Sequence, residues 1–129
     1  PEITARLDPR RVDVIVANLV GNALKHGAPP VSLRLHAAAG EITIEVRDQG
    51  PGVDPAVLPH VFDRFYKADT ARSRSDGSGL GLAIARENAR LHRDDDHQGD
   101  ITAAGSRDGG AVFTVRLPRQ AHAPSEEDT

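Results

Sequence analysis

The stretch that most constrains the fold runs from residue 12 to residue 27 and reads VDVIVANLVGNALKHG. At about 100° per residue, its apolar side chains fall on one side of a helix, as in a helix packed on a core. These side chains are Val12, Ile15, Val16, Leu19 and Ala23. Asn18, Asn22 and Lys25 share the neighbouring side, at i, i+4 and i+7. Asn is a weak helix former, so two asparagines one turn apart inside an apolar helix predict a binding site on that side.

The residues before and after this stretch predict its ends. Asp8 and Pro9 are typical of an N-cap and a first-turn proline, and we expect the helix to run to about His26 and stop at Gly27. Ahead of the helix, the alternation of Ile3, Ala5 and Leu7 with polar residues predicts a short edge strand.

Alternating apolar and polar residues predict four further strands. Val31–Ala37 and Glu41–Asp48 are close enough to form an antiparallel hairpin with one face buried. Gly99–Ala104 and Gly110–Leu117 predict two more strands. In the last of them we expect four residues to point inward, namely Ala111, Phe113, Val115 and Leu117.

The region between the two pairs of strands is less regular. Prolines after Asp54 and Leu58 predict a short helical turn. The polar run 67–76 lies between an aromatic cluster and a glycine segment, which is typical of a mobile lid. Helical spacing then resumes, with an expected apolar stripe of Leu80, Ala83, Ile84 and Leu91. We interpret Arg93–His97 as a charged loop rather than a metal site.

Length and charge exclude several functions. A chain of 129 residues predicts one domain, which we place at residues 1–118, with a disordered tail at 119–129. The net charge of −3 argues against nucleic-acid binding, and the absence of cysteine excludes disulfides and thiolate metal sites. No apolar run reaches about 18 residues, so we expect a cytoplasmic domain without direct membrane contact.

The polar positions together predict a pocket for Mg²⁺–ATP. The amide oxygen of Asn22, with that of Asn18, suits Mg²⁺, and Lys25 can neutralise phosphate. The backbone amides of 77–82, at the start of the later helix, form an anion site. Asp48, as an ionised acceptor followed by a glycine turn, suits the exocyclic amine of adenine. Neither a GxxxxGK[ST] loop nor a GxGxxG fingerprint is present.

Four motifs in order, NLVGNALKH, DQGPGV, FDRFYKAD and GSGLGLAIA, resemble the N, first-glycine, F and second-glycine boxes of sensor histidine kinases. The chain is similar to their catalytic ATP-binding domain from about Leu7 to Leu117. This resemblance implies a two-layer α/β sandwich of the Bergerat type, with a mixed, mostly antiparallel sheet of about five strands and about three helices on one face. It also implies nucleotide contacts at Asn18, Asn22, Lys25, His26, Asp48, Gly50, Gly52, Tyr66, Lys67, Gly77, Gly79, Leu80, Gly81 and Leu82.

The resemblance further implies which reaction is catalysed. In related ATPases a Glu that activates water stands one turn before the metal-binding Asn, and Asn18 occupies this position here. His26 and Lys67 stand where the family often has Tyr and Arg. None of the six histidines lies in a sequence resembling the phosphoacceptor helix. We therefore expect phosphoryl transfer to a histidine of a separate dimerisation domain in a membrane-anchored kinase, then to a response regulator. The alternatives are a serine kinase of the anti-sigma type and a non-catalytic nucleotide-sensing module.

Overall fold

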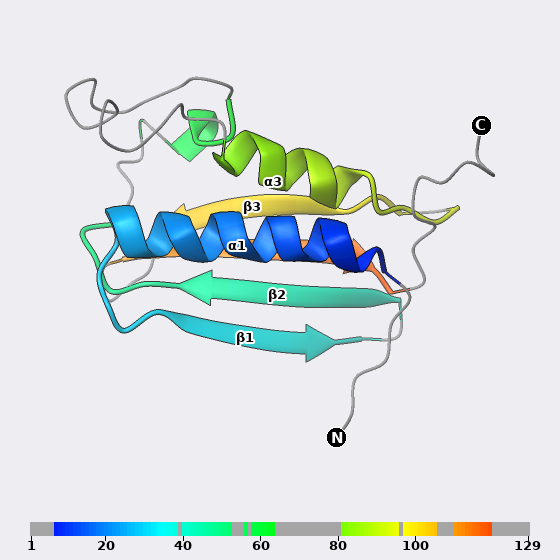
Figure 1. Cartoon of the computed structure of the whole chain (residues 1–129), viewed down its shortest axis with the longest axis horizontal. Coiled ribbons are helices and arrows are strands. Elements are labelled where there is room, and N and C mark those ends of the chain that lie inside the picture. Colours follow the sequence, from blue (N-terminus) through cyan, green and yellow to red (C-terminus); the bar gives the residue numbers. More distant parts are fainter. Residues whose placement is uncertain are drawn as a thin grey trace.

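The computed structural model describes residues 7–38, 40–52, 56, 58–63, 81–95, 97–105 and 110–119, with the side chain of His26 outside that description. The elements are α1 (Pro9–His26), β1 (Ser32–Ala37), β2 (Glu41–Arg47), η1 (Leu58–His60), α3 (Gly81–Arg90), β3 (Asp100–Gly105) and β4 (Ala111–Pro118). The strands form one antiparallel sheet in the order β1-β2-β4-β3, and both α-helices cover the same face (Figure 1). The predicted two-layer sandwich is confirmed. Of the predicted first strand only Leu7 is described, and it belongs to no strand.

The ends of α1 agree with their prediction from local sequence. Asp8 is the N-cap, and its Oδ1 accepts the backbone N–H groups of Arg10 at 3.1 Å and Arg11 at 3.4 Å. Pro9 lies in the first turn, where backbone N–H groups have no intrahelical acceptor, so its lack of an N–H costs no hydrogen bond. At the other end the Gly27 N–H donates to Ala23 O at 2.9 Å and closes the helix. The predicted bounds of this helix are confirmed.

The buried stripe of α3 differs from the predicted one. Ala85 and Ala89 are fully buried, whereas Ile84 is 38% exposed and Ala83 is only half-buried. The reason is steric, because methyl side chains let α3 lie close to α1 and the sheet, and the bulkier Ile84 stays outside. Leu80 lies outside the described residues.

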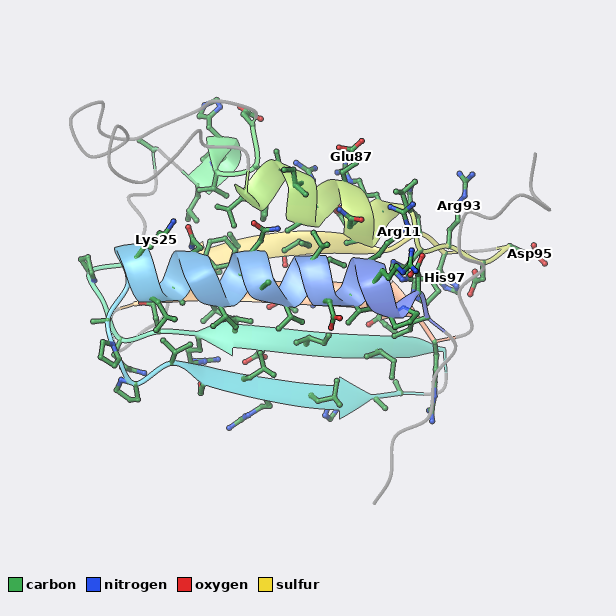
Figure 2. The ribbon with its side chains drawn as sticks, in the orientation of Figure 1. Arg11, Lys25, Glu87, Arg93, Asp95 and His97 are labelled. Carbon is green, nitrogen blue, oxygen red and sulfur yellow. The ribbon has the colours of Figure 1, made fainter. Side chains whose placement is uncertain are left out.

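A polar contact also joins the two helices. Arg11 Nη1 donates to Asn88 Oδ1 at 2.9 Å, and Figure 2 shows Arg11 between the start of α1 and the end of α3. Asn88, which interrupts the apolar spacing of its helix, therefore has a structural partner on α1. This contact aligns the helices at the end away from Lys25.

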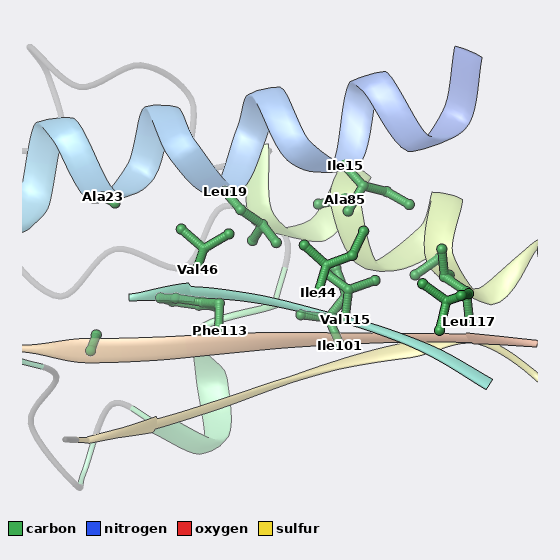
Figure 3. Packing of buried hydrophobic residues seen from close by; sticks show 13 residues of the cluster. Ile15, Leu19, Ala23, Ile44, Val46, Ala85, Ile101, Phe113, Val115 and Leu117 are labelled. Carbon is green, nitrogen blue, oxygen red and sulfur yellow. The ribbon is translucent and has the colours of Figure 1, made fainter. Parts of the chain in front are cut away.

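The core lies between the helix layer and the sheet (Figure 3). All four inward residues predicted on β4 are buried, and Ile44 of β2 lies in register with Val115 of β4. Three residues of α1 cover them, namely Ile15, Leu19 and Ala23. On the other face the same strands carry residues such as Glu45, Arg47 and Arg116, so the sheet has one covered and one polar face.

The hairpin forms as predicted, but its first strand does not have a buried face. Leu33 and Leu35 pair with Val46 and Ile44, which places all four on the helix-facing side of the sheet. Nevertheless Leu33 is 54% and Leu35 is 51% exposed. Among the described residues β1 is an edge strand, and α1 covers β2 and β4 rather than β1.

His92 is a buried link between the two helices. Its side chain is fully buried, Nδ1 lies 3.0 Å from Asn88 O, and Nε2 accepts the Asp8 N–H at 3.1 Å. Because Nε2 is the acceptor, the proton is on Nδ1 and is donated to the Asn88 carbonyl. His92 thus joins the last turn of α3 to the N-cap of α1.

Hydrogen bonds join the described residues of the charged insert after His92. Arg93 pairs with Gln98, the Asp94 N–H donates to His97 O at 2.9 Å, and the His97 N–H donates to Asp94 Oδ1 at 2.7 Å. In the part of the chain that the structure describes, no group of three or more His, Cys, Asp or Glu side chains is arranged to hold a metal ion. Within those same ranges no helix has the length and apolar character to cross a membrane.

Candidate functional site

The amide side of α1 faces the start of α3. Asn18 Nδ2 donates to Val14 O at 2.9 Å, one turn back in the helix, which turns its oxygen outward. That oxygen lies against Gly81, because a Cβ added to Gly81 would be 2.9 Å from Asn18 Oδ1. Two boxes that are far apart in the sequence therefore meet, and a side chain at residue 81 would require the Asn18 side chain to shift.

Asn22 and Lys25 continue this side of α1 toward its C-terminus. Asn22 is half-buried, and its amide has no hydrogen-bond partner among the residues that the structure describes. Lys25 is exposed and forms no ion pair with any described residue. In Figure 2 its side chain extends from α1 toward the side of the molecule on which η1 and α3 lie. Next to Asn18, no described residue therefore competes with a ligand for these two polar groups.

Asp48 is the buried carboxylate of the site. It directly follows β2, is only 4% exposed, and its Oδ1 accepts the Gly50 N–H at 2.8 Å. Its own N–H donates to Ala111 O at 3.1 Å. The next residue, Gln49, donates its N–H to Ala28 O at 2.9 Å. Backbone bonds thus hold the Asp48 turn to β4 on one side and to the segment after α1 on the other.

Glycines allow the Asp48 turn to lie close to β4 and to the segment after α1. A Cβ on Gly27 would lie 2.6 Å from Asp48 Oδ1, and a Cβ on Gly50 would lie 2.6 Å from Gly27 Cα. Gly110 has φ +81°, and a Cβ there would overlap Asp48 O. Gly52 has φ +83°, and its Cβ would be 2.9 Å from Gly110 O. A side chain at any of these positions would displace the backbone around the buried carboxylate.

The sequence interpretation missed the part that Gly27 and Gly110 play in the site. The sequence predicts only a helix stop at Gly27 and only a strand start at Gly110. The adjacent glycines at 109 and 110, just before a strongly alternating strand, are the one local signal that could have identified Gly110. No local signal identifies Gly27, because its contact is with a residue on another element.

The first turn of α3 contributes backbone groups. Gly81 and Leu82 begin the helix, where the first N–H groups have no intrahelical acceptor. The Leu82 side chain packs against the core, so only its backbone N–H is available to a ligand. The remaining predicted contacts, at Tyr66, Lys67, Gly77, Gly79 and Leu80, lie outside the described residues, as does the side chain of His26.

Comparison with known proteins identifies the family. The family described as "Histidine kinase-, DNA gyrase B-, and HSP90-like ATPase" matches residues 7–121. The signal transduction histidine-protein kinase AfsQ2 of Streptomyces coelicolor is 60% identical over 126 residues, which cover 98% of this chain and 23% of AfsQ2. The chain therefore spans only about a quarter of the length of that relative.

Two solved structures resemble the fold as well as the sequence. The mycobacterial sensor histidine kinase MprB has a TM-score of 0.69 and 26% identity, over 94% of this chain and 83% of that one. Full-length ShkA in complex with AMPPNP has a TM-score of 0.65 and 30% identity, over 88% of this chain and 22% of that one. The chain belongs to the histidine kinase-, DNA gyrase B- and HSP90-like ATPase family and is a catalytic ATPase domain of the sensor histidine kinase type.

Proposed function

We propose that this domain binds Mg²⁺–ATP along the C-terminal half of α1 and transfers the γ-phosphoryl group to a histidine of a separate dimerisation domain. The observation that carries the proposal is the contact between Asn18 Oδ1 and Gly81, the first residue of α3. This contact places the amide side of α1 beside a helix N-terminus, which favours an anion such as a phosphate. The ShkA complex contains AMPPNP, an analogue of ATP, and this supports the choice of nucleotide.

Asp48 is the proposed partner of the adenine amine. Its Oδ1 already accepts the Gly50 N–H, so Oδ2 is left to accept from a base. An acceptor-only carboxylate matches the amine of adenine and repels the carbonyl oxygen that guanine carries at the same ring position. Gly50 and Gly52 keep side chains away from the turn that the base would approach.

Asn22 and Lys25 are the proposed partners of the metal and the phosphates. The residues fit Mg²⁺, because the Asn22 amide oxygen has no other partner among the described residues and can supply one hard ligand. Water and phosphate can supply the other ligands that Mg²⁺ requires. When bound, Mg²⁺ would supply positive charge that neutralises the phosphates. The Lys25 ammonium adds a positive charge beside Asn22, and the backbone N–H groups of Gly81 and Leu82 donate from α3.

Asn18 supports phosphoryl transfer rather than hydrolysis. Its side-chain nitrogen donates to Val14 O, and an amide cannot accept a proton at neutral pH. Of the described side chains on the amide side of α1, namely Asn18, Asn22 and Lys25, none is therefore a base for activating water. A neutral imidazole is already nucleophilic, so a histidine acceptor needs positioning more than it needs a base.

The acceptor and the later partners belong to the rest of the protein. His92 is excluded as an acceptor, because it is buried with both ring nitrogens bonded. We propose that residues 1–118 are the catalytic domain of a membrane-anchored kinase, that this domain lies in the cytoplasm, and that a response regulator receives the phosphoryl group. The chain covers only 23% of AfsQ2. The further domains that this proposal requires would lie in other parts of the full-length protein.

A transfer assay distinguishes the three candidate functions. The domain is incubated with γ-labelled ATP in three separate reactions. The first contains a dimerisation domain carrying the phosphoacceptor histidine, the second a serine-containing anti-anti-sigma protein, and the third no acceptor. We expect acid-labile label on the histidine acceptor alone. Label on serine would favour the anti-sigma type of kinase. Tight Mg²⁺-dependent binding without label on either acceptor would favour a nucleotide-sensing module.

Replacing Asn22 tests the metal site. Asn22→Ala is expected to weaken ATP binding at least about tenfold in the presence of Mg²⁺, since loss of a metal ligand or its support lowers affinity by such factors. In EDTA the variant and the wild type should bind equally weakly. Titration calorimetry measures both, and Leu24→Ala, an exposed change on the same helix turn, is the control. Equal losses with and without Mg²⁺ would contradict a metal role for Asn22.

Replacing Asp48 tests base recognition. Wild type is expected to bind ATP more tightly than GTP. Asp48→Ala should lower the ratio of the two affinities at least about tenfold, because the variant lacks the polar partner of the adenine amine. Competition of ATP and GTP against a fluorescent ATP analogue measures the preference. Gln49→Ala, an exposed change at the next residue, should retain it. Equal binding of ATP and GTP by the wild type would exclude the assigned role.

A further inference from the structure

We propose that Arg11 and Asn88 are positioning residues for the nucleotide phosphates, because their contact fixes which side of α3 faces α1. Arg11 Nη1, on α1, donates to Asn88 Oδ1, on α3, at 2.9 Å. Neither residue is among the proposed nucleotide contacts. The inference rests on the proposed function and adds a pair that acts through the placement of Gly81 beside Asn18.

Two contacts between α1 and α3 have the same spacing on both helices. Asn18 lies against Gly81, and Arg11 bonds Asn88. On α1 the contact residues are 11 and 18, and on α3 they are 81 and 88, so each pair is seven residues apart. Seven residues are about two helix turns, which places both contact residues of a helix on the same side. A rotation of α3 that turned Asn88 away from α1 would therefore turn Gly81 away as well.

The side-chain amides of the two asparagines are held in the same way. Asn18 Nδ2 donates to Val14 O at 2.9 Å, and Asn88 Nδ2 donates to Ile84 O at 2.8 Å, each one turn back in its own helix. These bonds leave each side-chain oxygen facing the other helix. At Asn88 the oxygen meets the Arg11 guanidinium, whereas at Asn18 it meets a glycine. The first contact therefore joins the two helices, and the second sets an oxygen beside the start of α3.

The packing of α3 on α1 fixes this rotation only weakly. The buried residues of α3 are Ala85 and Ala89. Their methyl groups let the helices approach closely but form low ridges, so they interlock little with the partner helix. A polar pair at a helix interface specifies the alignment, because other alignments leave its groups without partners. Arg11 suits this role, since an ion pair between its Nε and Asp8 Oδ2, 3.3 Å apart, holds the guanidinium on α1.

His92 links the same helices but fixes a different property of their arrangement. It lies beyond the last residue of α3, so its bond to the Asp8 N–H sets where the helix ends rather than which side faces α1. Removal of the imidazole leaves the bond between Arg11 and Asn88 in place. The affinity for nucleotide is therefore expected to depend on Arg11 and Asn88 more than on His92.

The rotation of α3 matters for the phosphates and not for the base. The first N–H groups of α3 have no intrahelical acceptor, and they start beside Asn18 in the proposed phosphate site. A rotated α3 would carry these groups and Gly81 away from Asn18 Oδ1. The turn at Asp48, the proposed partner of the base, is instead held by backbone bonds to β4 and to the segment after α1. Loss of the contact between Arg11 and Asn88 should therefore weaken the binding of phosphates and spare that of adenine.

The test compares two ligands on the 129-residue chain, at a temperature at which every variant is folded. Titration calorimetry measures the Kd of Mg²⁺–ATP, and NMR titration, which also detects weak binding, measures that of adenosine. Asn88→Ala is expected to raise the Kd of Mg²⁺–ATP about fivefold, an effect typical of residues that influence a site without touching it. The Kd of adenosine should stay within about twofold of wild type, because its proposed partner, Asp48, is independent of α3. A purely structural role predicts instead that both Kd values change alike.

Three further variants serve as controls. Arg10→Gln changes the exposed neighbour of Arg11 on α1, and Arg90→Gln removes an ion pair that fastens α3 to Asp100 of β3 rather than to α1. Both should leave the Kd of Mg²⁺–ATP within about twofold of wild type. Asn88→Asp keeps an oxygen for the guanidinium and should recover most of the affinity that Asn88→Ala loses.

A double-mutant cycle completes the test. Arg11→Gln alone should match Asn88→Ala, and in the Asn88→Ala background it should have no further effect on Kd, because its partner is already absent. An unchanged Kd of Mg²⁺–ATP for both single variants, equal losses for Mg²⁺–ATP and adenosine, an equal loss for Arg90→Gln, or additive losses in the double variant would each overturn the inference and leave the proposed function intact. Absence of ATP binding by the folded wild type would instead overturn the proposed function, and the role of Arg11 and Asn88 with it.

Discussion

Gly27→Ala is expected to raise the Kd for Mg²⁺–ATP by up to about a hundredfold, since losing a hydrogen bond to a charged group costs about 1.5–3 kcal/mol. The new Cβ would lie 2.6 Å from Asp48 Oδ1 and 2.7 Å from Ala23 O. Atoms do not approach so closely, so the carboxylate must leave the position that Gly50 and the base require. The backbone at Gly27, with φ −100° and ψ −154°, is open to alanine, so the effect arises from the contact alone.

Gly21→Ala is the matched control for this prediction. Gly21 lies within α1 between the two asparagines, and a Cβ there meets no atom within 4 Å. We expect it to stabilise the fold by about 0.5–1 kcal/mol through helix propensity and to leave Kd unchanged. Calorimetric titrations are run at a temperature at which circular dichroism shows every variant folded. A Kd for Gly27→Ala within threefold of wild type would show that Asp48 does not recognise the base from its present position.

His92→Ala is expected to lower the free energy of unfolding by about 3 kcal/mol, the usual range for emptying a fully buried site. The side chain is fully buried, so its removal leaves a cavity between α1 and α3. It also leaves the Asp8 N–H and the Asn88 carbonyl without their hydrogen-bond partner. Each unsatisfied polar group lowers the free energy of unfolding further. Chemical denaturation measures the change.

His97→Ala is the control for His92. The His97 side chain is 66% exposed, and its ion pair with Asp94 is at the surface, so its replacement should change stability by no more than about 0.5 kcal/mol. ATP affinity of the folded His92→Ala protein should stay near that of wild type, because Asp8 and Asn22 are separated by about 21 Å along α1. A loss of stability below 1 kcal/mol would contradict the bridging role of His92. A large loss of affinity would show that the two ends of α1 are coupled.

Elements whose signals are local could be predicted from the sequence. The bounds of α1 follow from Asp8, Pro9 and Gly27, and the inward residues of β4 follow from strict alternation. The prediction of a site at Asn18 and Asn22 likewise rests on a local signal, because two weak helix formers share one side of an apolar helix. In each case the relevant neighbours are at most a few residues away, so periodicity and capping rules suffice.

Features that depend on contacts between distant segments needed the tertiary structure. His92 meets Asp8 across 84 positions, and nothing near His92 in the sequence distinguishes it from the other histidines. Spacing alone did not predict that Ala85 and Ala89, rather than Ala83 and Ile84, would face the core, because close packing against α1 favours the smaller side chains.

The sequence by itself determined which chemical groups this protein presents, two amides, a lysine and an acid followed by glycines, and on which kinds of element they lie. Only the tertiary structure decided which of them touch: Asn18 against Gly81, and Asp48 against Gly27 and Gly110. The physical reason is that helix periodicity and turn preferences act within a few residues. The distance between two segments is instead set by the volumes of all the side chains packed between them.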